Sequence, residues 1–562
     1  MLFSEQLARA RSVVEVQCVT LREPYPAITL FFSVSDGAQR AQIVQMSADS
    51  FEPAWTQGVV KLRKLMTRHK LQGRWLRVDW VADAQALSWK SLNVQLSETK
   101  RNYFRHGLSL DAGFQQAFLE QELNANAMLY PGGDVEHAAV NIKNFRSYAS
   151  SRYGEIKTLD FIDDKPVFVL STCGVFCDSS GALHDLPGPG LDCGLRRMHP
   201  LAADDVSALV DRSADYLAAQ VQKTGKFVYG YFPCFDRPIN HYNALRHASS
   251  TYAMVEAWEL TRSKVLKKAI DRSLGYLTQK LIQEVDLPEG KRAAFLVDTD
   301  GEIKLGGNAV CLLALVKYSE VAETHVYDAL MEALALGITR MQDPVTGKFN
   351  HVLNYPDLSV KEAFRIIYYD GEAVFGIMRL YGFTKNPHWL SLVEKAFEYF
   401  IEQKHWQSHD HWLSYCVNEL TLYRPEERYF RFGLQNVSGH LDFVLQRETT
   451  YPTLLELMMA AERMLQRLEA APAARHLLAE MDLEKFYRAL HYRAHYLLNG
   501  HFWPELAMYF KNPARIVNSF FIRHHTFRVR IDDVEHYLSG FVAYHKFLKA
   551  GQKVVALYAV IP

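Results

Sequence analysis

Apolar residues recur three or four positions apart along most of the chain after about residue 204. This spacing is typical of amphipathic helices. The eleven segments that show it are Asp204–Gln222, Leu245–Leu260, Leu266–Ile282, Asn308–Tyr318, Val326–Met341, Glu372–Tyr381, Leu390–Phe400, Trp412–Leu422, Thr453–Leu465, Ala474–Leu497 and Val534–Leu548. One outer helix is missing from a set of twelve, and Glu427–Leu434 can supply a short one. The pattern therefore predicts one helical hairpin repeated six times.

The links between these helices also resemble one another. The sequence TGKF at Thr224–Phe227 recurs at Thr346–Phe349, and GGNAV at Gly306–Val310 is echoed by DGEAV at Asp370–Val374. Self-similarity at roughly 45 to 50 residues is typical of stacked two-helix units, none of which can bury its apolar face alone. Six such units can close into a ring in which one helix of each pair lines the centre.

The first 195 residues follow a different pattern. Short segments rich in β-branched and aromatic residues predict strands, and two longer ones predict helices. The strands are Val13–Leu21, Ala27–Val34, Arg40–Met46, Trp75–Ala82 and Lys165–Val175, and the helices are Glu52–His69 and Leu110–Leu123. The stretch LPGPG at Leu186–Gly190 cannot continue a helix or a strand. We expect an α+β accessory domain at 1–195, with a possible role in binding a protein partner, and a mainly α toroid at 196–562.

Composition and charge narrow the class of protein. The 562 residues are 49% hydrophobic and 22% charged, and 63 Lys and Arg balance 63 Asp and Glu. Because no net field attracts a polyanion, a nucleic-acid partner is disfavoured. The N-terminus carries Glu5 without the apolar core of a signal peptide, and no run approaches 18 uninterrupted apolar residues. We therefore expect a cytoplasmic protein without membrane insertion.

The link before the second helix of the repeat contains the highest density of charged, polar and aromatic residues. This link carries Asp236, Arg237, His241, Tyr242, Asn243, Arg246 and His247. A link of more than twenty residues is longer than a plain connection, and its polar and aromatic content suggests ligand contact. Arg246 can clamp an anion, and His247 can exchange a proton near neutral pH. The alternative is that Asp236, Arg237 and Arg246 only tie the loop to its neighbours.

A second polar cluster, Phe521–His536, precedes the last helix. The alternation at Phe527–Ile531 predicts a short strand, after which Asp532 or Asp533 can cap the helix. The last inner helix of a sixfold ring is adjacent to the first. Arg528, Arg530, Asp532 and His536 would then face Arg246 and His247 across one pocket. Capping alone explains one aspartate, and consecutive His524 and His525 point apart, which disfavours a metal there.

Acidic residues mark the starts of other inner helices. A glycosidase usually needs one protonated and one ionised carboxyl group. Asp370, Glu372, Asp442 and Glu448 are candidates for such a pair. The alternative is strong, because an acidic residue at a helix start is favoured by capping and by the helix dipole without any catalytic role.

A group of cysteines and histidines near the end of the first domain superficially resembles a zinc site. It comprises Cys173, Cys177, His184, Cys193 and His199. The C-x3-C spacing is looser than that of usual zinc knuckles, and both cysteines lie in or near a predicted strand. We predict ordinary reduced thiols, with neither a metal nor another cofactor.

The hairpin repeat, the DGEA link and the segment Leu380–Leu390 resemble the six-hairpin (α/α)6 toroid superfamily. That superfamily includes glycoside hydrolases, polysaccharide lyases, N-acylglucosamine 2-epimerases and glucuronyl C5-epimerases. The resemblance covers about residues 200–548 and transfers no family's catalytic residues. It implies a deep aromatic-lined cup for a saccharide, to which Tyr369, Tyr368 and Trp412 are among the candidate contributors.

The leading hypothesis is an enzyme that performs acid/base chemistry on an anionic saccharide, most simply hydrolysis. His247 or His536 would move a proton, Arg246 and Arg530 would bind the anion, and Asp370, Glu372 or Glu448 would supply a carboxylate. The competing hypothesis is epimerisation by two opposed bases. A third is a ring that binds a polymer or protein without catalysis.

Overall fold

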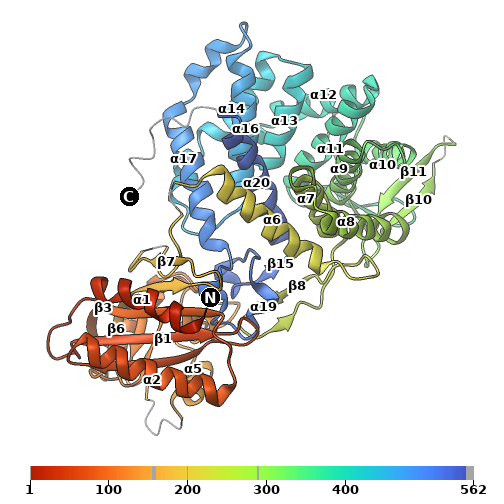
Figure 1. Cartoon of the computed structure of the whole chain (residues 1–562). Helices are drawn as coiled ribbons and strands as arrows, with labels where there is room; N and C mark the ends of the chain where they lie inside the picture. Colours follow the sequence, from red (N-terminus) through yellow and green to blue (C-terminus); the bar gives the residue numbers. More distant parts are fainter. Residues whose placement is uncertain (1, 155–159, 191, 199, 288–289, 552–562) are drawn as a thin grey trace.

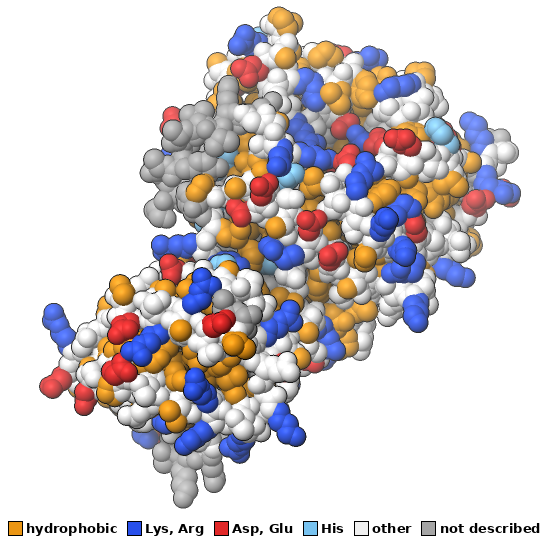
Figure 2. All heavy atoms as spheres, in the orientation of Figure 1, with side chains coloured by type: hydrophobic (Ala, Val, Ile, Leu, Met, Phe, Trp, Pro, Cys, Tyr) orange, Lys and Arg blue, Asp and Glu red, His pale blue; other side chains and the backbone are white. Residues whose placement is uncertain are grey.

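The computed structural model describes residues 2–154, 160–190, 192–198, 200–287 and 290–551. An N-terminal sheet domain packs against one end of a helical ring (Figure 1). Figure 2 shows Lys and Arg side chains interspersed with Asp and Glu on the displayed face of both parts. This distribution agrees with the balanced charge of the sequence.

The N-terminal domain is built on a seven-stranded antiparallel sheet of order β2-β1-β3-β6-β4-β5, with β7 also paired to β6. Its strands are β1 Ile28–Ser35, β2 Gln42–Ala48, β3 Trp75–Ser88, β4 Gly107–Ser109, β5 Ala117–Phe118, β6 Pro166–Cys177 and β7 Leu183–Leu186, and its helices are α1 Phe3–Gln17, α2 Phe51–His69, α3 Trp89–Glu98, α4 Glu120–Ala125 and α5 Ile142–Tyr153. Along β1, Leu30, Phe32 and Val34 pack with residues of α1 and α2, while Phe31 joins the core shared with the ring. The predicted α+β class of this domain is confirmed.

Two predicted elements of this domain are wrong. Val13–Leu21 is not a strand, because α1 runs to Gln17 and buries Leu7, Ala10 and Val14 at helical spacing. Leu110–Leu123 is not one helix, since Asp111 accepts hydrogen bonds from the backbone amides of Gln115 and Gln116, both at 2.9 Å. These bonds hold a turn, which is followed by β5 and α4.

Among the described residues, twelve helices form the ring. The inner helices are α7 Ala244–Thr261, α9 Leu305–Ala322, α11 Tyr368–Thr384, α13 His411–Tyr423, α16 Thr453–Glu469 and α20 Ile531–Lys549. Each inner helix contacts the next, and α20 contacts α7, so the ring is closed. The outer helices are α6 Ala203–Gln220, α8 Lys264–Tyr276, α10 Asp328–Met341, α12 Pro387–Glu402, α14 Glu427–Ser438 and α17 Leu483–Tyr496. The predicted (α/α)6 toroid is confirmed, and α14 is the missing outer helix.

Smaller elements lie in the links. They are β8 Gly230–Phe232, β9 Arg237–Pro238, β10 Ile282–Asp286, β11 Arg292–Leu296, β12 Glu302–Lys304, β13 Val352–Asn354, β14 Val360–Glu362, β15 Val529–Arg530, α15 Leu441–Gln446, α18 Pro504–Ala507 and α19 Pro513–Ile516, with short π or 3-10 turns at Leu277–Leu281, His405–Ser408, Arg475–Glu480, Leu497–Gly500 and Arg523–His525. The segment Ala474–Leu497 is therefore not one helix, since Asp482 caps the start of α17 by accepting from the Lys485 amide. The predicted strand at Phe527–Ile531 exists as β15, which pairs with β8.

Helix α9 is largely apolar, with Lys317 and Glu320 near its C-terminal end. It is the one helix among the described residues whose length and composition would suit a membrane span, and 72% of the apolar window is buried in the protein. As an inner helix it is enclosed by α7, α11 and α10, which accounts for its apolar composition.

The sheet domain and the ring share buried polar contacts. Arg77 on β3 pairs with Asp79 at 2.7 Å and donates to the carbonyls of Gly194 and Glu505, both at 2.9 Å. In a second contact, Arg101 Nε donates to the His524 carbonyl at 2.7 Å and Asn102 Nδ2 donates to the Arg523 carbonyl at 2.8 Å. The N-terminal domain therefore fixes the backbone of the segment before β15.

Candidate functional site

A cavity of about 450 Å³ opens where the inner helices begin, and we call it the cup. Five of the six inner helices contribute residues from their first turns or from the links before them. The polar and aromatic residues of its wall are Asn243, Arg246, Ser249, Tyr368, Tyr369, Glu372, His411, Trp412, Arg447, Thr449, Thr450, Tyr451, Thr453, His524, His525, Arg528, Arg530, Asp532, Asp533, Glu535 and His536. The helix starts that the sequence pattern singled out therefore converge on one site.

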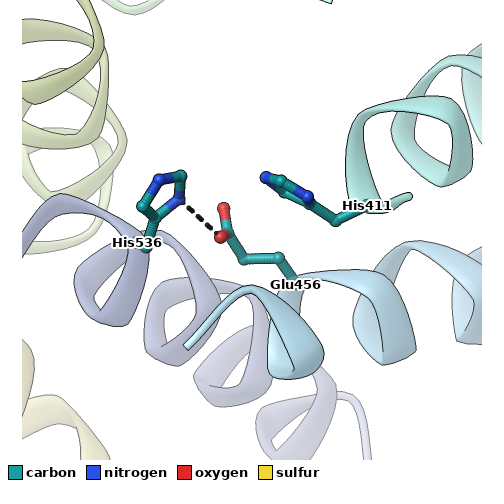
Figure 3. Close-up of side chains that lie close together, drawn as sticks. All are labelled: His411, Glu456 and His536. Carbon is teal, nitrogen blue, oxygen red and sulfur yellow. Dashed lines mark hydrogen bonds and ion pairs between the residues drawn. The ribbon is translucent and has the colours of Figure 1, made fainter. Parts of the chain in front are cut away.

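Two histidines and a glutamate form the centre of the cup (Figure 3). His536 on α20 is hydrogen-bonded through Nδ1 to Glu456 Oε2 of α16 at 2.8 Å. His411, at the start of α13, lies with its ring centroid 5.5 Å from that of His536. Tyr415 donates a hydrogen bond of 3.2 Å to the second carboxylate oxygen of Glu456. Glu456 is thereby fixed between the two imidazoles.

Neighbouring carboxyl groups favour the protonated form of His536. Burial alone would lower the pKa of His536, but the carboxylates of Glu535 and Glu456 outweigh it and raise the pKa to about 10. Burial, with Glu456 and Asp532 nearby, raises the pKa of Glu535 to about 8 against the opposing effect of His536. His536 is therefore placed to act as a proton donor at neutral pH.

Other buried polar atoms at the cup have no hydrogen-bond partner among the described residues. They include Glu372 Oε2 on α11 and His411 Nε2. Burial, followed by the charge of Asp410, raises the pKa of Glu372 well above its ordinary value. Because unpaired buried polar atoms are costly, their convergence on one cavity indicates a polar ligand.

Arginines and aspartates form one side of the cup. Arg246 Nε lies 2.9 Å from Asp532 Oδ2, and Arg530 lies 3.0 Å from both Asp532 and Asp533. Arg528 also pairs with Asp533, at 3.2 Å. Asp533 further accepts from the Arg530 amide at 3.1 Å and so caps α20. The predicted proximity of Arg246 to Arg528, Arg530, Asp532 and His536 is confirmed.

Aromatic rings form the opposite side. Tyr369 and Trp412 line the cavity, and the hydroxyl groups of Tyr368 and Tyr451 lie 3.0 Å apart. Arg447 lies over the Tyr451 ring at 5.5 Å and donates to Thr449 Oγ1 at 2.7 Å. No carboxylate among the described residues pairs with Arg447. This side therefore offers flat apolar surfaces beside a cation that is not neutralised.

His247 does not line the cup, so the prediction that it shares the pocket with Arg246 is wrong. Its Nδ1 lies 2.7 Å from the Tyr242 hydroxyl and its Nε2 lies 3.0 Å from the Ser273 carbonyl of α8. Burial lowers the pKa of His247 to about 4. Consecutive helical residues are turned by about 100°, so when Arg246 faces the cup His247 faces the outer helix. Tyr242 belongs to the same outer contact.

Only one of the four candidate carboxylates lines the cup. Asp370 is buried against His351 Nε2 at 3.2 Å, Asp442 pairs with Lys485 at 2.8 Å, and Glu448 is exposed beside a neighbouring cavity. Glu372 alone lies in the cup wall. The fold therefore does not bring two of these four carboxyl groups together in the cup as a hydrolytic pair.

The other predicted residues lie around the rim. Asn243 lines the cup and caps α7, since its Oδ1 accepts from the Arg246 amide at 3.1 Å. Asp236 pairs with Arg515 at 2.5 Å, and Arg237 lies over the Phe232 ring at 5.4 Å. His241 is exposed, with its ring 5.5 Å from that of Tyr229. Asp236, Arg237 and His241, which the sequence suggested as substrate-binding residues, lie outside the cup wall. The Asp236–Arg515 pair is a contact of the loop-tying kind that was the alternative interpretation.

Sequence reasoning missed His411, Glu456 and Glu535. Each is a polar residue within the first two turns of an inner helix. His411 directly precedes the segment Trp412–Leu422, and Glu456 lies inside Thr453–Leu465. A search for ionisable residues near the start of every second helix would have found all three.

The cysteine and histidine group of the first domain lies away from the cup. Cys173 and Cys177 are on β6, and burial raises the pKa of both thiols. His184 is on β7, with Nε2 3.7 Å from Asp178. His199 lies outside the described residues. Raised thiol pKa values disfavour the thiolate form that zinc requires.

Several solved structures are similar in fold to this chain but have low sequence identity to it. No protein-family model matches the chain, and no curated protein matches its sequence. A D-mannose isomerase is similar at 12% identity and TM-score 0.47, over 63% of this chain and 100% of that one. The cellobiose 2-epimerase from Spirochaeta thermophila DSM 6192 is similar at 11% identity and TM-score 0.45, over 62% and 96%. The GH76A α-1,6-mannanase from Salegentibacter sp. HEL1_6 is similar at 9% identity and TM-score 0.42, over 61% and 100%.

Proposed function

We propose that this protein is a carbohydrate-active enzyme that epimerises or isomerises a sugar by proton transfer beside its carbonyl group. The observation that carries this proposal is the pair of histidines, His411 and His536, on either side of Glu456 in a cup with aromatic walls. Such reactions need one group that accepts a proton from carbon and one that donates a proton.

The two histidines have different surroundings that suit these two tasks. His411 Nδ1 lies 3.2 Å from Asp410 Oδ1, and His411 Nε2 has no hydrogen-bond partner among the described residues. The assignment of His411 as the base therefore rests on this free ring nitrogen in the cup wall. His536 is held in its protonated form by Glu535 and Glu456. His411 Nε2 would take the proton from the carbon beside the carbonyl. His536 would then protonate the resulting enediolate on carbon or oxygen.

The cup wall suits a sugar as the substrate. The rings of Tyr369 and Trp412 offer faces for a pyranose, and Asn243, Ser249 and Glu372 offer polar groups for hydroxyls. The charges of Arg246, Arg528 and Arg530 are opposed by Asp532 and Asp533. Among the described residues of the cup wall, Arg447 is the arginine without a carboxylate partner, and it offers its charge to the acidic group of an anionic saccharide.

Solvent isotope exchange tests this proposal. The full chain is incubated in deuterium oxide with aldoses, ketoses, disaccharides, uronates and phosphosugars, and the products are followed by NMR. We expect deuterium at the carbon beside the carbonyl without bond cleavage. His411→Ala and His536→Ala should each slow the exchange by about 100-fold or more.

The matched control is His388→Ala, which removes an exposed histidine from outer helix α12. Its exchange rate should equal that of the unchanged protein. Sugar binding without exchange or cleavage across the whole panel would leave a non-catalytic binding ring as the correct description.

Hydrolysis is the second candidate, because Glu372 and Glu535 both line the cup and both have raised pKa values. A protonated carboxyl group can assist a leaving oxygen, and Glu456 or Asp532 would then have to activate water. New reducing ends without carbon-bound deuterium would favour this reaction.

A further inference from the structure

We propose that the N-terminal domain completes a second subsite next to the cup, which binds an acidic group on the second residue of an oligosaccharide. This inference rests on the proposed function, since the cup would hold the reacting sugar. A cavity of about 230 Å³ is lined by Lys100, Phe443, Gln446, Arg447, Glu448 and Thr449. It shares Arg447 and Thr449 with the wall of the cup, so the two cavities lie side by side.

The charges of this subsite come from both parts of the molecule. Lys100 belongs to the N-terminal domain and Arg447 to the link before α16. Neither cation has a carboxylate within ion-pair distance among the described residues, whereas Arg246, Arg528 and Arg530 in the cup all do. Glu448 lies at the exposed rim and offsets one positive charge. An acidic group between Lys100 and Arg447 would neutralise the remaining positive charge.

The backbone around Lys100 is fixed before any ligand binds. Lys100 forms a β-bridge with His137. Next to it, Arg101 donates to the carbonyls of Gly132 at 2.9 Å and Gly133 at 2.8 Å, and also to that of His524, whose side chain lines the cup. A cation on a segment that is already ordered loses little entropy on binding.

Phe443 gives the subsite a surface for a sugar ring. Its ring lies under the Arg447 guanidinium at 5.1 Å and is partly exposed, at 37%. A saccharide that extends from the cup past Arg447 would meet this ring and then Lys100. The chemistry therefore fits a disaccharide or longer chain with a carboxylate on its second residue.

Binding of a matched disaccharide pair tests the subsite. The two probes differ only at C6 of the second residue, which is a hydroxymethyl group in one and a carboxylate in the other. Calorimetry with the full chain should give about threefold to tenfold tighter binding of the acidic probe at low salt. Lys100→Met should abolish this preference and leave the affinity for the neutral probe unchanged.

Two further variants separate the charge from other effects. Lys100→Arg should restore the preference for the acidic probe. Lys64→Ala should retain it, because Lys64 is an exposed residue on α2, across the sheet from the ring. Unfolding temperatures of all variants are compared first, to verify that they fold.

The outcomes separate this inference from the proposed function. Isotope exchange on a monosaccharide without any acidic preference, or a preference that survives Lys100→Met, overturns the subsite and leaves the function standing. Lys100-dependent binding of the acidic disaccharide without exchange or cleavage supports the subsite and overturns the catalytic proposal. Absence of binding by both probes overturns the subsite.

Discussion

The centre of the cup depends on the electrostatics of a few side chains. His536 is partly exposed in the cup wall, and its charged form is favoured because Glu535 and Glu456 lie beside it. The folded-state pKa of His536, about 10, lies above the usual value of about 6.5 for an unfolded chain. The folded protein therefore binds this proton more tightly, and the resulting stabilisation is complete below pH 6.5 and is lost as the pH rises through 10.

Glu535→Gln should lower the pKa of His536, because Glu535 makes the largest contribution that raises it. The imidazole resonances of His536 should then titrate at a lower pH in NMR spectra. The free energy of unfolding should also fall less steeply between pH 6.5 and 10 than in the unchanged protein. An unaltered titration of His536 in the variant would contradict the assigned role of Glu535.

At the residue scale, the sequence alone predicted about a third of the residues that line the cup. Arg246, Arg530 and Asp532 were recognisable because they lie in two links that contain many charged, polar and aromatic residues. His247 was misplaced because sequence proximity to Arg246 does not fix which side of the helix it occupies. Glu456 was missed because it lies inside an apolar segment, and His411 because it lies just before one. Only closure of the ring brings both residues to His536.

The inner helices approach one another closely through glycine. A Cβ atom on Gly371 of α11 would lie 2.6 Å from Trp412 Cβ and 2.8 Å from the backbone nitrogen of Leu413 on α13. A Cβ atom on Gly306 of α9 would meet Glu372 and Tyr369 on α11. These contacts give a physical reason for the glycines in the repeated GGNAV and DGEAV links, since larger residues would separate the inner helices.

Gly371→Ala should destabilise the protein by about 1–3 kcal/mol, because helices α11 and α13 must move apart to admit the new methyl group. The control is Gly275→Ala on outer helix α8, where no atom lies within 4 Å of the new Cβ. That change should be neutral or stabilise by up to about 1 kcal/mol through helix propensity. Urea unfolding monitored by circular dichroism measures both, and equal effects would refute the packing argument.

At the element scale, periodicity predicted the helices of the ring well and the first domain less well. The repeated apolar stripe of Asp204–Gln222 and its counterparts is long enough to be read without tertiary information. The secondary structure of Val13–Leu21 is ambiguous in the sequence, because valines favour strands. The helical spacing of Leu7, Ala10 and Val14 decides the outcome, since these residues pack α1 on the sheet. The pairing of β8, β9 and β15 into one sheet could not be predicted, since β15 lies in a link almost 300 positions after the link that holds β8 and β9.

The sheet domain and the ring behave as one folded body. Phe31, Trp75 and Phe176 of the sheet belong to the same buried cluster as the ring helices. Arg77 and Asp79 are buried at this junction, with side chains 0% and 1% exposed. The toroid was predictable from its repeat, but this shared core was not, because nothing in the pattern of 1–195 indicates which face of its sheet meets the ring.

Arg77→Met should destabilise the whole protein by about 3–5 kcal/mol, because Asp79 would remain buried without its partner. Arg11→Met is the control, since Arg11 pairs with Glu15 and Glu52 on the exposed surface. Its thermal midpoint should equal that of the unchanged protein. Two separate unfolding transitions in the unchanged protein would contradict the description as one body.

The contact of α20 with α7 has a consequence for biosynthesis. The histidine-bearing helix α20 begins at Ile531, whereas Arg246 lies near the start of α7. A nascent polypeptide that has emerged only as far as α17 has most of the inner wall but neither His536 nor the partner that seals α7. Helix α20 is synthesised after the other helices of the ring, so a product truncated before it would lack His536 and would expose the apolar side of α7 that α20 covers.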